Sequence, residues 1–137
     1  MADPDAGVAF LLDPERDVEP YLAAAARLGV LITHSFETHV HDDHLTGSFG
    51  LARLRPITVV TGAAFEAAAA HAALAAGEEI AVGDLAVRRV ATPGHTPEHV
   101  SYLVADLARS SGPQSGRPKR RARGASRRGH RGAVARR

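Results

Sequence analysis

The chain has 137 residues, of which 45% are hydrophobic and 23% are charged, a balance that is typical of one globular domain. No apolar run is long enough for a transmembrane helix, and the acidic start lacks the basic region of a signal peptide, so we expect a cytoplasmic protein that does not enter membranes. The absence of cysteine excludes disulfides, thiolate nucleophiles and cysteine-rich zinc sites.

The formal net charge of +2 is distributed unevenly along the chain. Residues 1–106 contain six arginines and all fifteen acidic residues, whereas residues 107–137 contain eleven basic residues and no acid. A basic segment with few apolar residues cannot bury a core, so we expect a folded domain over 1–108 and a disordered, arginine-rich segment over 109–137. Such a segment can attract nucleic acid, although it lacks the aromatic residues of a stacking surface.

Strands and helices alternate in the first half of the chain. Apolar and β-branched runs predict three short strands, at residues 8–12, 30–36 and 57–61. Alanine-rich stretches predict two helices, at residues 17–28 and 63–76. Each of these helices is followed directly by a glycine, Gly29 or Gly77, the residue that most often ends a helix. A third, short helix is expected over 45–54, with Asp42 or Asp43 as its N-cap.

The second half of the chain contains strands in succession. Residues 79–82 and 85–91 flank Gly83-Asp84, a dipeptide that is typical of hairpin turns, and a final strand is expected over 100–104. This order of elements predicts an α/β architecture with β-sheets inside and helices outside. With four Phe, two Tyr and no Trp, the core is expected to consist mainly of Leu, Val and Ile.

Four potential metal ligands lie within six residues of the sequence T-H-V-H-D-D-H-L-T, namely His39, His41, Asp43 and His44. A fifth, His95, follows fifty-six residues after the first, in the sequence T-P-G-H-T. Zn²⁺ and non-haem Fe²⁺ prefer imidazole and carboxylate ligands, and three or four of these must converge on one point. Because the dense group follows an apolar strand, we expect it at the edge of a sheet. The alternative interpretation of these histidines is a solvated loop.

These motifs resemble the metal signature of the metallo-β-lactamase superfamily, over about residues 7–108. Within it, D-P-E-R-D at 13–17, E-T-H-V-H at 37–41 and T-P-G-H-T-P-E-H-V-S-Y at 92–102 look most like the persulfide dioxygenases. Glyoxalase II, the hydroxyacylglutathione hydrolase, shares most of the motif. The resemblance implies a partial αββα sandwich with a mixed β-sheet, truncated at both ends. An incomplete sheet exposes strand edges and apolar faces, which favours either aggregation or a homo-oligomer.

As the resemblance to persulfide dioxygenases implies, His39 and His95 match two protein ligands of a single Fe²⁺, and the substrate is glutathione persulfide, which is oxidised to sulfite. His41, Asp43 and His44 would then orient ligands and water through hydrogen bonds. The third family ligand, an aspartate after the last predicted strand, has no counterpart, because no acid follows position 106. We therefore expect weak metal binding and impaired activity.

As the resemblance to glyoxalase II implies, His39, His41 and His95 hold one Zn²⁺, while Asp43 and His44 help to hold a second. A water activated by the two metals would attack the carbonyl of a glutathione thioester, and Asp43 is the candidate catalytic residue.

The sequence does not decide between iron and zinc, or between a site for one ion and a site for two. A protein that binds nucleic acid through its basic segment and an inactive remnant that binds zinc weakly are further alternatives. We interpret the other histidines of the domain structurally: His34 as a packed core residue, His71 as a surface residue of a helix, and His99 as a turn residue.

Overall fold

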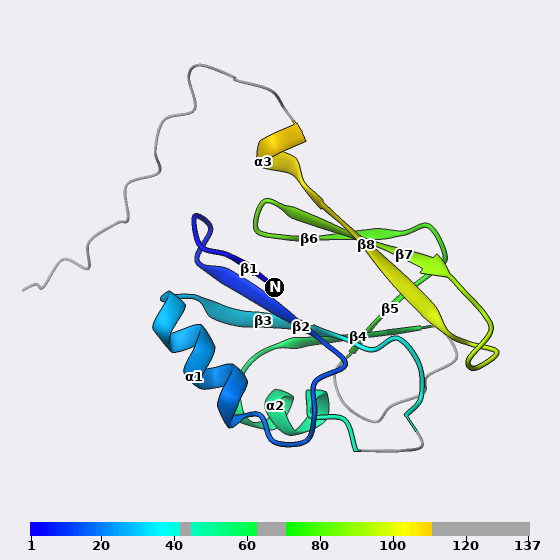
Figure 1. The fold of residues 1–137 in the computed structure, drawn as a ribbon, viewed down its shortest axis with the longest axis horizontal. Helices are drawn as coiled ribbons and strands as arrows, with labels where there is room; N and C mark the ends of the chain where they lie inside the picture. The colour runs from blue at the N-terminus through cyan, green and yellow to red at the C-terminus, as the bar shows by residue number, and fades with distance from the viewer. Residues whose placement is uncertain (42–44, 63–70, 111–137) are drawn as a thin grey trace, which may run out of the picture.

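The computed structural model describes residues 1–41, 45–62 and 71–110. Within these ranges the chain forms three layers, which are a pair of helices, a five-stranded sheet and a three-stranded sheet (Figure 1). The strands are β1 (Ala2–Asp3), β2 (Val8–Leu12), β3 (Leu31–Phe36), β4 (Thr58–Gly62), β5 (His71–Leu74), β6 (Glu79–Val82), β7 (Leu85–Ala91) and β8 (Val100–Asp106). The helices are α1 (Glu19–Leu28), α2 (Ser48–Leu54) and the single turn α3 (Leu107–Ser110).

The larger sheet is mixed and has the strand order β1-β2-β3-β4-β5. Strands β2 to β5 are parallel, and the short β1 pairs antiparallel with β2. The smaller sheet is antiparallel, with the order β6-β7-β8. Because β2 and β3 run in the same direction, the residues that follow them meet at one edge of the larger sheet, where ligands bind in many α/β proteins.

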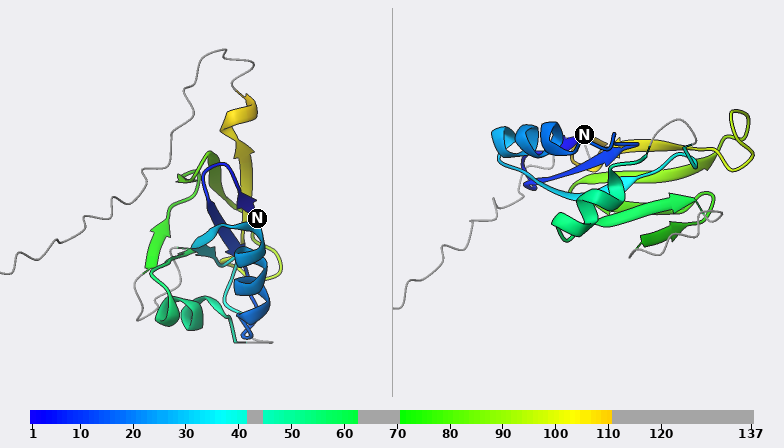
Figure 2. Two further views of the ribbon diagram at one scale, coloured as in Figure 1. Left: turned by 90° about the vertical axis from the view of Figure 1, so that its left-hand side faces the viewer. Right: turned by 90° about the horizontal axis from the view of Figure 1, so that it is seen from below.

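The side chains of the larger sheet alternate between two cores, as the two-residue period of a strand requires. Phe10, Phe36 and Val60 face the smaller sheet, where they pack with Val87 and its neighbours. The adjacent Val59 faces the helices instead, and packs with buried residues of α2 and the segment before α1. Figure 2 shows α1 and α2 on the face of the larger sheet that is opposite the smaller sheet. Full burial of each such side chain contributes about 2 kcal/mol.

The expected α/β sandwich with a mixed sheet is confirmed, and most predicted elements are present. The predicted strands at 8–12, 79–82 and 85–91 have the bounds of β2, β6 and β7. Gly29 ends α1 in the left-handed conformation, with φ +67°. In the described part of the chain β8 lies at the edge of its sheet, where the side chain of Leu103 is 60% exposed. None of the helices in that part is long and apolar enough to cross a membrane.

Two sequence predictions are wrong. A helix was expected over 63–76, but β5 forms there instead, and it pairs with β4 in a register that places Ala72 opposite Val60. His71 therefore begins a strand and is not part of a helix, while residues 63–70 lie outside the described ranges. Alanine has the highest helix propensity of all residues, but helix propensity is a weak preference, and burial of Leu74 between the sheets outweighs it.

The second error concerns the start of α2. Its N-cap is Gly47, whereas Asp42 and Asp43, the predicted caps, lie outside the described residues. A Cβ atom at position 47 would collide with the carbonyl oxygen of Glu15, so only glycine fits there. Sequence reasoning missed this N-cap because the collision involves a segment 32 residues earlier in the chain.

Candidate metal centre

The candidate site lies where the chain leaves β2 and β3, next to the loop that joins β7 to β8. Asp13 follows β2 directly, and residues 37–41 follow β3. The loop at 92–99 carries the second predicted histidine motif. The N–H group of Val100 donates to the carbonyl oxygen of Thr38 at 2.9 Å, so a backbone hydrogen bond joins the two segments.

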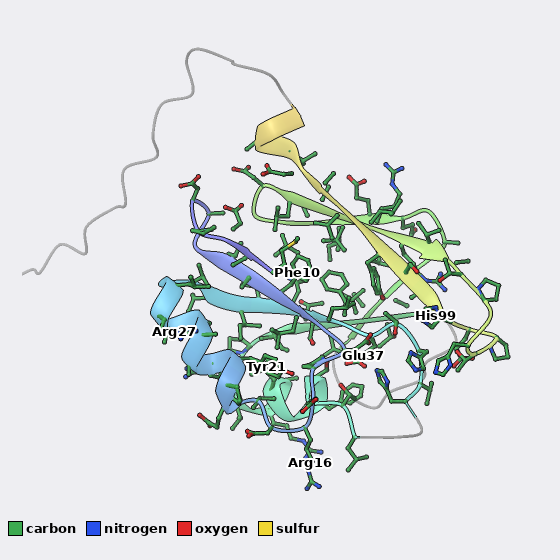
Figure 3. All side chains as sticks on the ribbon, viewed as in Figure 1. Phe10, Arg16, Tyr21, Arg27, Glu37 and His99 are labelled. Atoms are coloured by element: carbon green, nitrogen blue, oxygen red, sulfur yellow. The ribbon has the colours of Figure 1, made fainter. Side chains whose placement is uncertain are left out.

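Four imidazole rings gather between these segments, those of His39, His41, His95 and His99. His39 is central, because its ring centroid lies 4.2 Å from that of His41, 4.9 Å from that of His95 and 5.3 Å from that of His99. Figure 3 shows His99 at the same end of the molecule as Glu37. The fold thus brings together histidines that are fifty-six residues apart in the sequence.

Three of the five predicted ligands, His39, His41 and His95, therefore lie close to one another. The other two, Asp43 and His44, lie outside the described residues. His99 was interpreted as a structural residue that follows a turn. Its Nδ1 atom lies 3.0 Å from the hydroxyl of Thr92, and its ring also borders His39. Metal binding by these residues stays a prediction.

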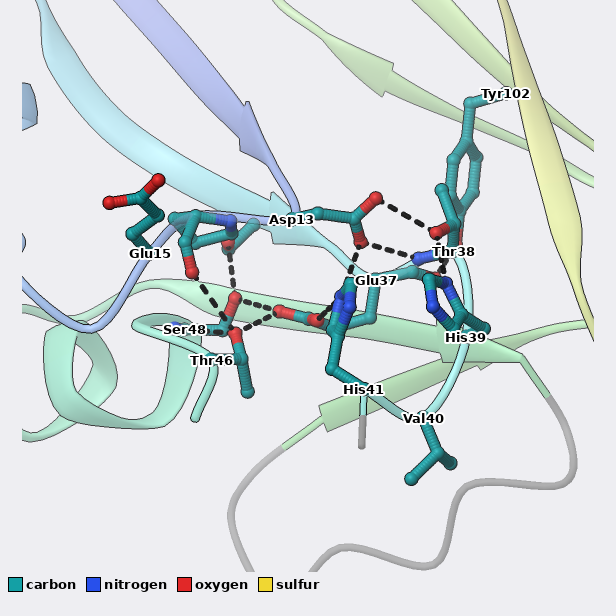
Figure 4. Close-up of polar contacts among 12 residues, drawn as sticks. Asp13, Glu15, Glu37, Thr38, His39, Val40, His41, Thr46, Ser48 and Tyr102 are labelled. Carbon is teal, nitrogen blue, oxygen red and sulfur yellow. Dashed lines mark hydrogen bonds and ion pairs between the residues drawn. The ribbon is translucent and has the colours of Figure 1, made fainter. Parts of the chain in front are cut away.

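Asp13 joins the end of β2 to the histidine segment (Figure 4). Its Oδ1 atom accepts a hydrogen bond from the N–H of Thr38 at 2.7 Å and lies 3.2 Å from Nε2 of His41. Its Oδ2 atom accepts from the Thr38 hydroxyl at 2.8 Å, and that hydroxyl lies 2.8 Å from Nδ1 of His39. Asp13 adopts φ +43°, a conformation that is rare outside glycine and is often found at functional sites.

Glu37 is a buried acid on the other side of His41, with only 2% of its surface exposed. Its Oε1 atom accepts hydrogen bonds from the hydroxyl groups of Thr46, at 2.6 Å, and Ser48, and its Oε2 atom lies 3.4 Å from Nε2 of His41. Burial raises the pKa of the Glu37 carboxyl group, and the nearby carboxylate of Asp13 adds to this effect, although the hydroxyl hydrogen bonds oppose it. An acid placed this way is costly to bury, so we expect it to have a function.

Within the described residues, Asp13, Glu37 and His41 form a group whose candidate ligand atoms all lie within 4.8 Å of one another. This spacing is tight enough for a cation. The distances from Nε2 of His41 to the two carboxylates are also those of hydrogen bonds or ion pairs. We therefore interpret the two acids as groups that orient the histidines, an arrangement that is common around metal ligands.

The electrostatic surroundings of His39 suit a metal ligand. Burial lowers the pKa of its imidazole, and the neighbouring His41 and His95 lower it further. A lowered pKa favours the neutral ring, which is the form that binds metals. His95 is exposed at the surface, so an ion between the two rings would be open to small molecules.

Sequence reasoning did not assign site roles to Asp13 or Glu37. Both occur in the motifs at 13–17 and 37–41, and each follows directly on a parallel strand, which is a signal that could have indicated them. Their hydrogen bonds depend on the pairing of β2 with β3, which no local pattern reveals.

No family model matches the chain. The hydroxyacylglutathione hydrolase of Acidiphilium cryptum is 38% identical over 108 residues, which cover 77% of this chain and 44% of that protein. The human hydroxyacylglutathione hydrolase-like protein is 43% identical over 83 residues, 61% of this chain and 29% of that protein. Human persulfide dioxygenase ETHE1 is 32% identical over 107 residues, 77% of this chain and 42% of that protein. The chain thus spans less than half the length of these relatives.

Solved structures of similar proteins also match this chain over part of their length. ETHE1 from Myxococcus xanthus superposes with a TM-score of 0.71 at 37% identity, over 76% of this chain and 46% of that chain. A metallo-β-lactamase from Staphylococcus aureus superposes with a TM-score of 0.67 at 28% identity, over 73% of this chain and 32% of that chain. Sequence and fold agree, and the chain belongs to the metallo-β-lactamase superfamily, in the branch of glyoxalase II and the persulfide dioxygenases.

Proposed function

We propose that this chain forms the histidine side of an iron centre that oxidises glutathione persulfide, as a persulfide dioxygenase does. The observation that supports the proposal most strongly is the separation of 4.9 Å between the ring centroids of His39 and His95, which come from two distant motifs. The likeness to two ETHE1 proteins is the second support.

The residues present fit such a group. The lowered pKa of His39 favours its neutral ring, and the rings of His39 and His95 meet edge to face, with 83° between their planes. Bound Fe²⁺ would supply coordination positions at which O₂ and a persulfide sulfur can meet. The proposed net reaction consumes one persulfide, one O₂ and one water, and gives glutathione, sulfite and two protons. The terminal sulfur is oxidised and O₂ is reduced.

In this proposal the residues of the chain hold the ion and orient its ligands. His39 and His95 would hold the ion, while Asp13 and Glu37 orient the segment that carries His39 and His41. Residues 107–137, which follow β8, contain no acid and so offer no carboxylate ligand. Because an anionic ligand neutralises charge as well as forming a bond, we propose that iron binds this chain weakly.

A second candidate function is hydrolysis of a hydroxyacylglutathione thioester with zinc. It is favoured by the separation of 4.2 Å between the rings of His39 and His41, which would allow three imidazoles to serve one Zn²⁺. The hydroxyacylglutathione hydrolases among the relatives also support it. In this proposal Asp43 and His44 contribute to a second zinc position, with Asp43 acting in catalysis.

One experiment separates the two proposals. Because weak binding allows the ion to be lost on purification, the purified full chain is first equilibrated with excess Fe²⁺ or Zn²⁺ and its bound metal is measured. It is then assayed in parallel for O₂ uptake with sulfite formation from glutathione persulfide, and for thioester hydrolysis. Iron together with O₂ uptake supports the dioxygenase, and zinc together with hydrolysis supports the hydrolase. Neither metal and neither activity would contradict both.

Matched histidine variants show whether any activity depends on this site. His39→Ala and His95→Ala should each lose the bound metal and the activity. His130→Ala, which changes a histidine of the basic segment, should retain both. Equal losses in all three variants would show that metal binding is not specific to the proposed centre.

A further inference from the structure

We propose that the edge of β8 binds the same edge of a second copy of this chain, so that the two smaller sheets join into one antiparallel sheet. Among the described strands, β8 lies at the end of the smaller sheet and pairs with β7 alone. It leads directly into α3 (Figure 1). The proposal concerns the backbone of β8 and does not rest on the proposed function.

The pairing of β7 with β8 determines which backbone groups of β8 face this edge. At one end of the pairing, the N–H of Thr92 donates to the carbonyl oxygen of His99 at 3.0 Å. At the other end, the N–H of Leu107 donates to the carbonyl oxygen of Asp84 at 2.9 Å. Both pairs belong to the register of β7 and β8. Because hydrogen-bonded pairs recur at every second residue of an antiparallel ladder, the residues of β8 that bond to β7 are those with odd numbers.

Tyr102 and Val104 lie between the bonded positions, so their N–H and C=O groups point away from β7 and towards the edge. Within residues 1–41, 45–62 and 71–110, these backbone groups have no hydrogen-bond partner. At the start of the strand, by contrast, the N–H of Val100 donates to the carbonyl oxygen of Thr38 at 2.9 Å. The unpaired part of the edge therefore begins after Val100.

β8 lacks the features that normally protect the edge of a sheet, which are short length, charged side chains and proline. It has seven residues, and none before the last is charged. The side chains of Leu103 and Val104 are 60% and 38% exposed. The other edge strands of the described structure, β1, β5 and β6, have only two, four and four residues. β8 is therefore the edge that is best suited to pairing.

A second copy suits this edge better than the chain's own C-terminal residues do. Residues 111–137 contain ten basic residues and one β-branched residue, Val134, so they have little preference for a strand. The edge of β8 matches itself, because an antiparallel pair of identical strands has the two-fold symmetry of a closed dimer. Pairing also leaves the short β6 as the outer strand at both ends of the joined sheet, so assembly stops at two copies.

The charge of the C-terminal residues favours an antiparallel pair over a parallel one. Residues 107–137 contain eleven basic residues and no acid. In a parallel pair the two copies of this segment would begin side by side, about 4.8 Å apart. In an antiparallel pair with Val104 opposite Val104, the two Asp106 residues lie about 14 Å apart along the strands, and the chains continue in opposite directions. This separation exceeds the screening length of about 8 Å at physiological salt.

The hydrogen bond of Val100 determines the register of the pair. If Leu103 lay opposite Leu103, Val100 would have to bond to Asp106 of the second copy, but its N–H already bonds to the segment after β3. If Val104 lies opposite Val104, Tyr102 is opposite Asp106 of the second copy, and Val100 is not needed. The two-fold axis therefore passes between the two Val104 residues.

Sedimentation equilibrium of the metal-free full chain, over a range of protein concentrations, tests the dimer. The expected result is an equilibrium between monomer and dimer that persists in high salt. Association that disappears in high salt would instead indicate nucleic acid bound to the basic residues, and it would overturn the proposal. A monomer at every concentration, or species larger than a dimer, would overturn it as well.

A proline variant tests whether the backbone of the edge forms the contact. Val104→Pro removes an N–H that points to the edge and no hydrogen bond to β7, so the fold should tolerate it. The dissociation constant of the dimer should rise by about 10-fold or more, because both hydrogen bonds between the two Val104 residues use this N–H. Val104→Thr keeps the N–H and the shape of the side chain, and should match the wild type. Equal dissociation constants for Val104→Pro and Val104→Thr would overturn the proposal.

Cross-linking gives an answer even if the proline variant does not fold. The chain has no cysteine, so a single introduced cysteine reports one position. Val104→Cys should form a disulfide between two copies on mild oxidation, because the Cα atoms of such a strand pair lie about 5.5 Å apart. Leu54→Cys is the control, on a 61% exposed position of α2, and should cross-link much less. More cross-linking in Leu54→Cys or in Leu103→Cys than in Val104→Cys would overturn the proposal.

Discussion

The two segments that carry the imidazole rings are held in different ways. His39 and His41 follow β3, where the carboxylates of Asp13 and Glu37 contact the segment from two sides. His95 lies on the exposed loop between β7 and β8, and the hydrogen bonds of Thr92 in that loop are at the surface. The half of the proposed centre that carries His39 and His41 is therefore prearranged by buried contacts. The half that carries His95 is less constrained.

This difference has an energetic consequence. A hydrogen bond in a buried network is costly to remove, because the remaining partner loses its contact with water as well as its bond. A hydrogen bond at the surface is replaced by water at little cost. We therefore expect substitutions behind His39 and His41 to affect stability more than substitutions around His95.

The largest effect is expected for Asp13→Ala. The substitution removes the acceptor for the Thr38 backbone and hydroxyl groups and for His41, and it places alanine in the left-handed region. We expect the free energy of unfolding of the metal-free protein to fall by about 3 kcal/mol, measured by urea denaturation. Asp17→Ala, in an exposed position, should stay within about 0.5 kcal/mol of the wild type. Equal stability of Asp13→Ala and Asp17→Ala would contradict the claim that Asp13 prearranges the segment of His39 and His41.

A smaller effect is expected for Tyr102→Phe. The Tyr102 hydroxyl donates to the carbonyl oxygen of Glu37 at 2.9 Å, and this bond ties β8 to the histidine segment. Its removal should lower the free energy of unfolding by about 1 kcal/mol. Tyr21→Phe is the matched control, because that hydroxyl accepts from an exposed backbone N–H at 3.1 Å. A larger loss of unfolding free energy in Tyr21→Phe than in Tyr102→Phe would show that β8 does not stabilise the histidine segment.

Glu37 should change the pH dependence of stability. Its pKa in the folded state is raised above 4.5, mainly by burial, so its favourable contribution is complete below the unfolded value and is lost as the pH rises through the folded value. Glu37→Gln removes this titration. The free energy of unfolding of the wild type relative to Glu37→Gln should therefore decrease as the pH rises above 4.5 in the metal-free protein. An increase over that range would contradict the account.

The smallest effect is expected in the exposed loop. Thr92→Val removes a hydroxyl that lies 3.0 Å from Nδ1 of His99 and 2.9 Å from the hydroxyl of Ser101, both at the surface. We expect the free energy of unfolding to change by no more than about 0.5 kcal/mol in a urea titration. A loss as large as that of Tyr102→Phe would show that the two segments are held equally firmly.

Local patterns predicted the elements whose geometry is local. The hairpin of β6 and β7 was predicted with its observed bounds, since Gly83 adopts the φ of +65° that the turn requires. The strand β5 was not predicted, because its alanines favour a helix and only the pairing with β4 makes them a strand.

The candidate site follows the same division. The two histidine motifs resemble a known metal signature, and this resemblance predicted that His39 and His95 lie close together. The roles of Asp13 and Glu37 could not be predicted in the same way. They depend on the register between β2 and β3, and on a backbone conformation that leaves no mark in the residue pattern.

The central claim is that His39 and His95 share one ion, and a metal titration followed by NMR tests it most directly. Zn²⁺ is added stepwise to the full chain labelled with ¹⁵N-histidine, and the ring signals of both residues are followed. The account predicts that the two sets of signals change together and reach saturation at one ion per chain. Signals that change at different zinc concentrations, or a change in only one of the two residues, would contradict it.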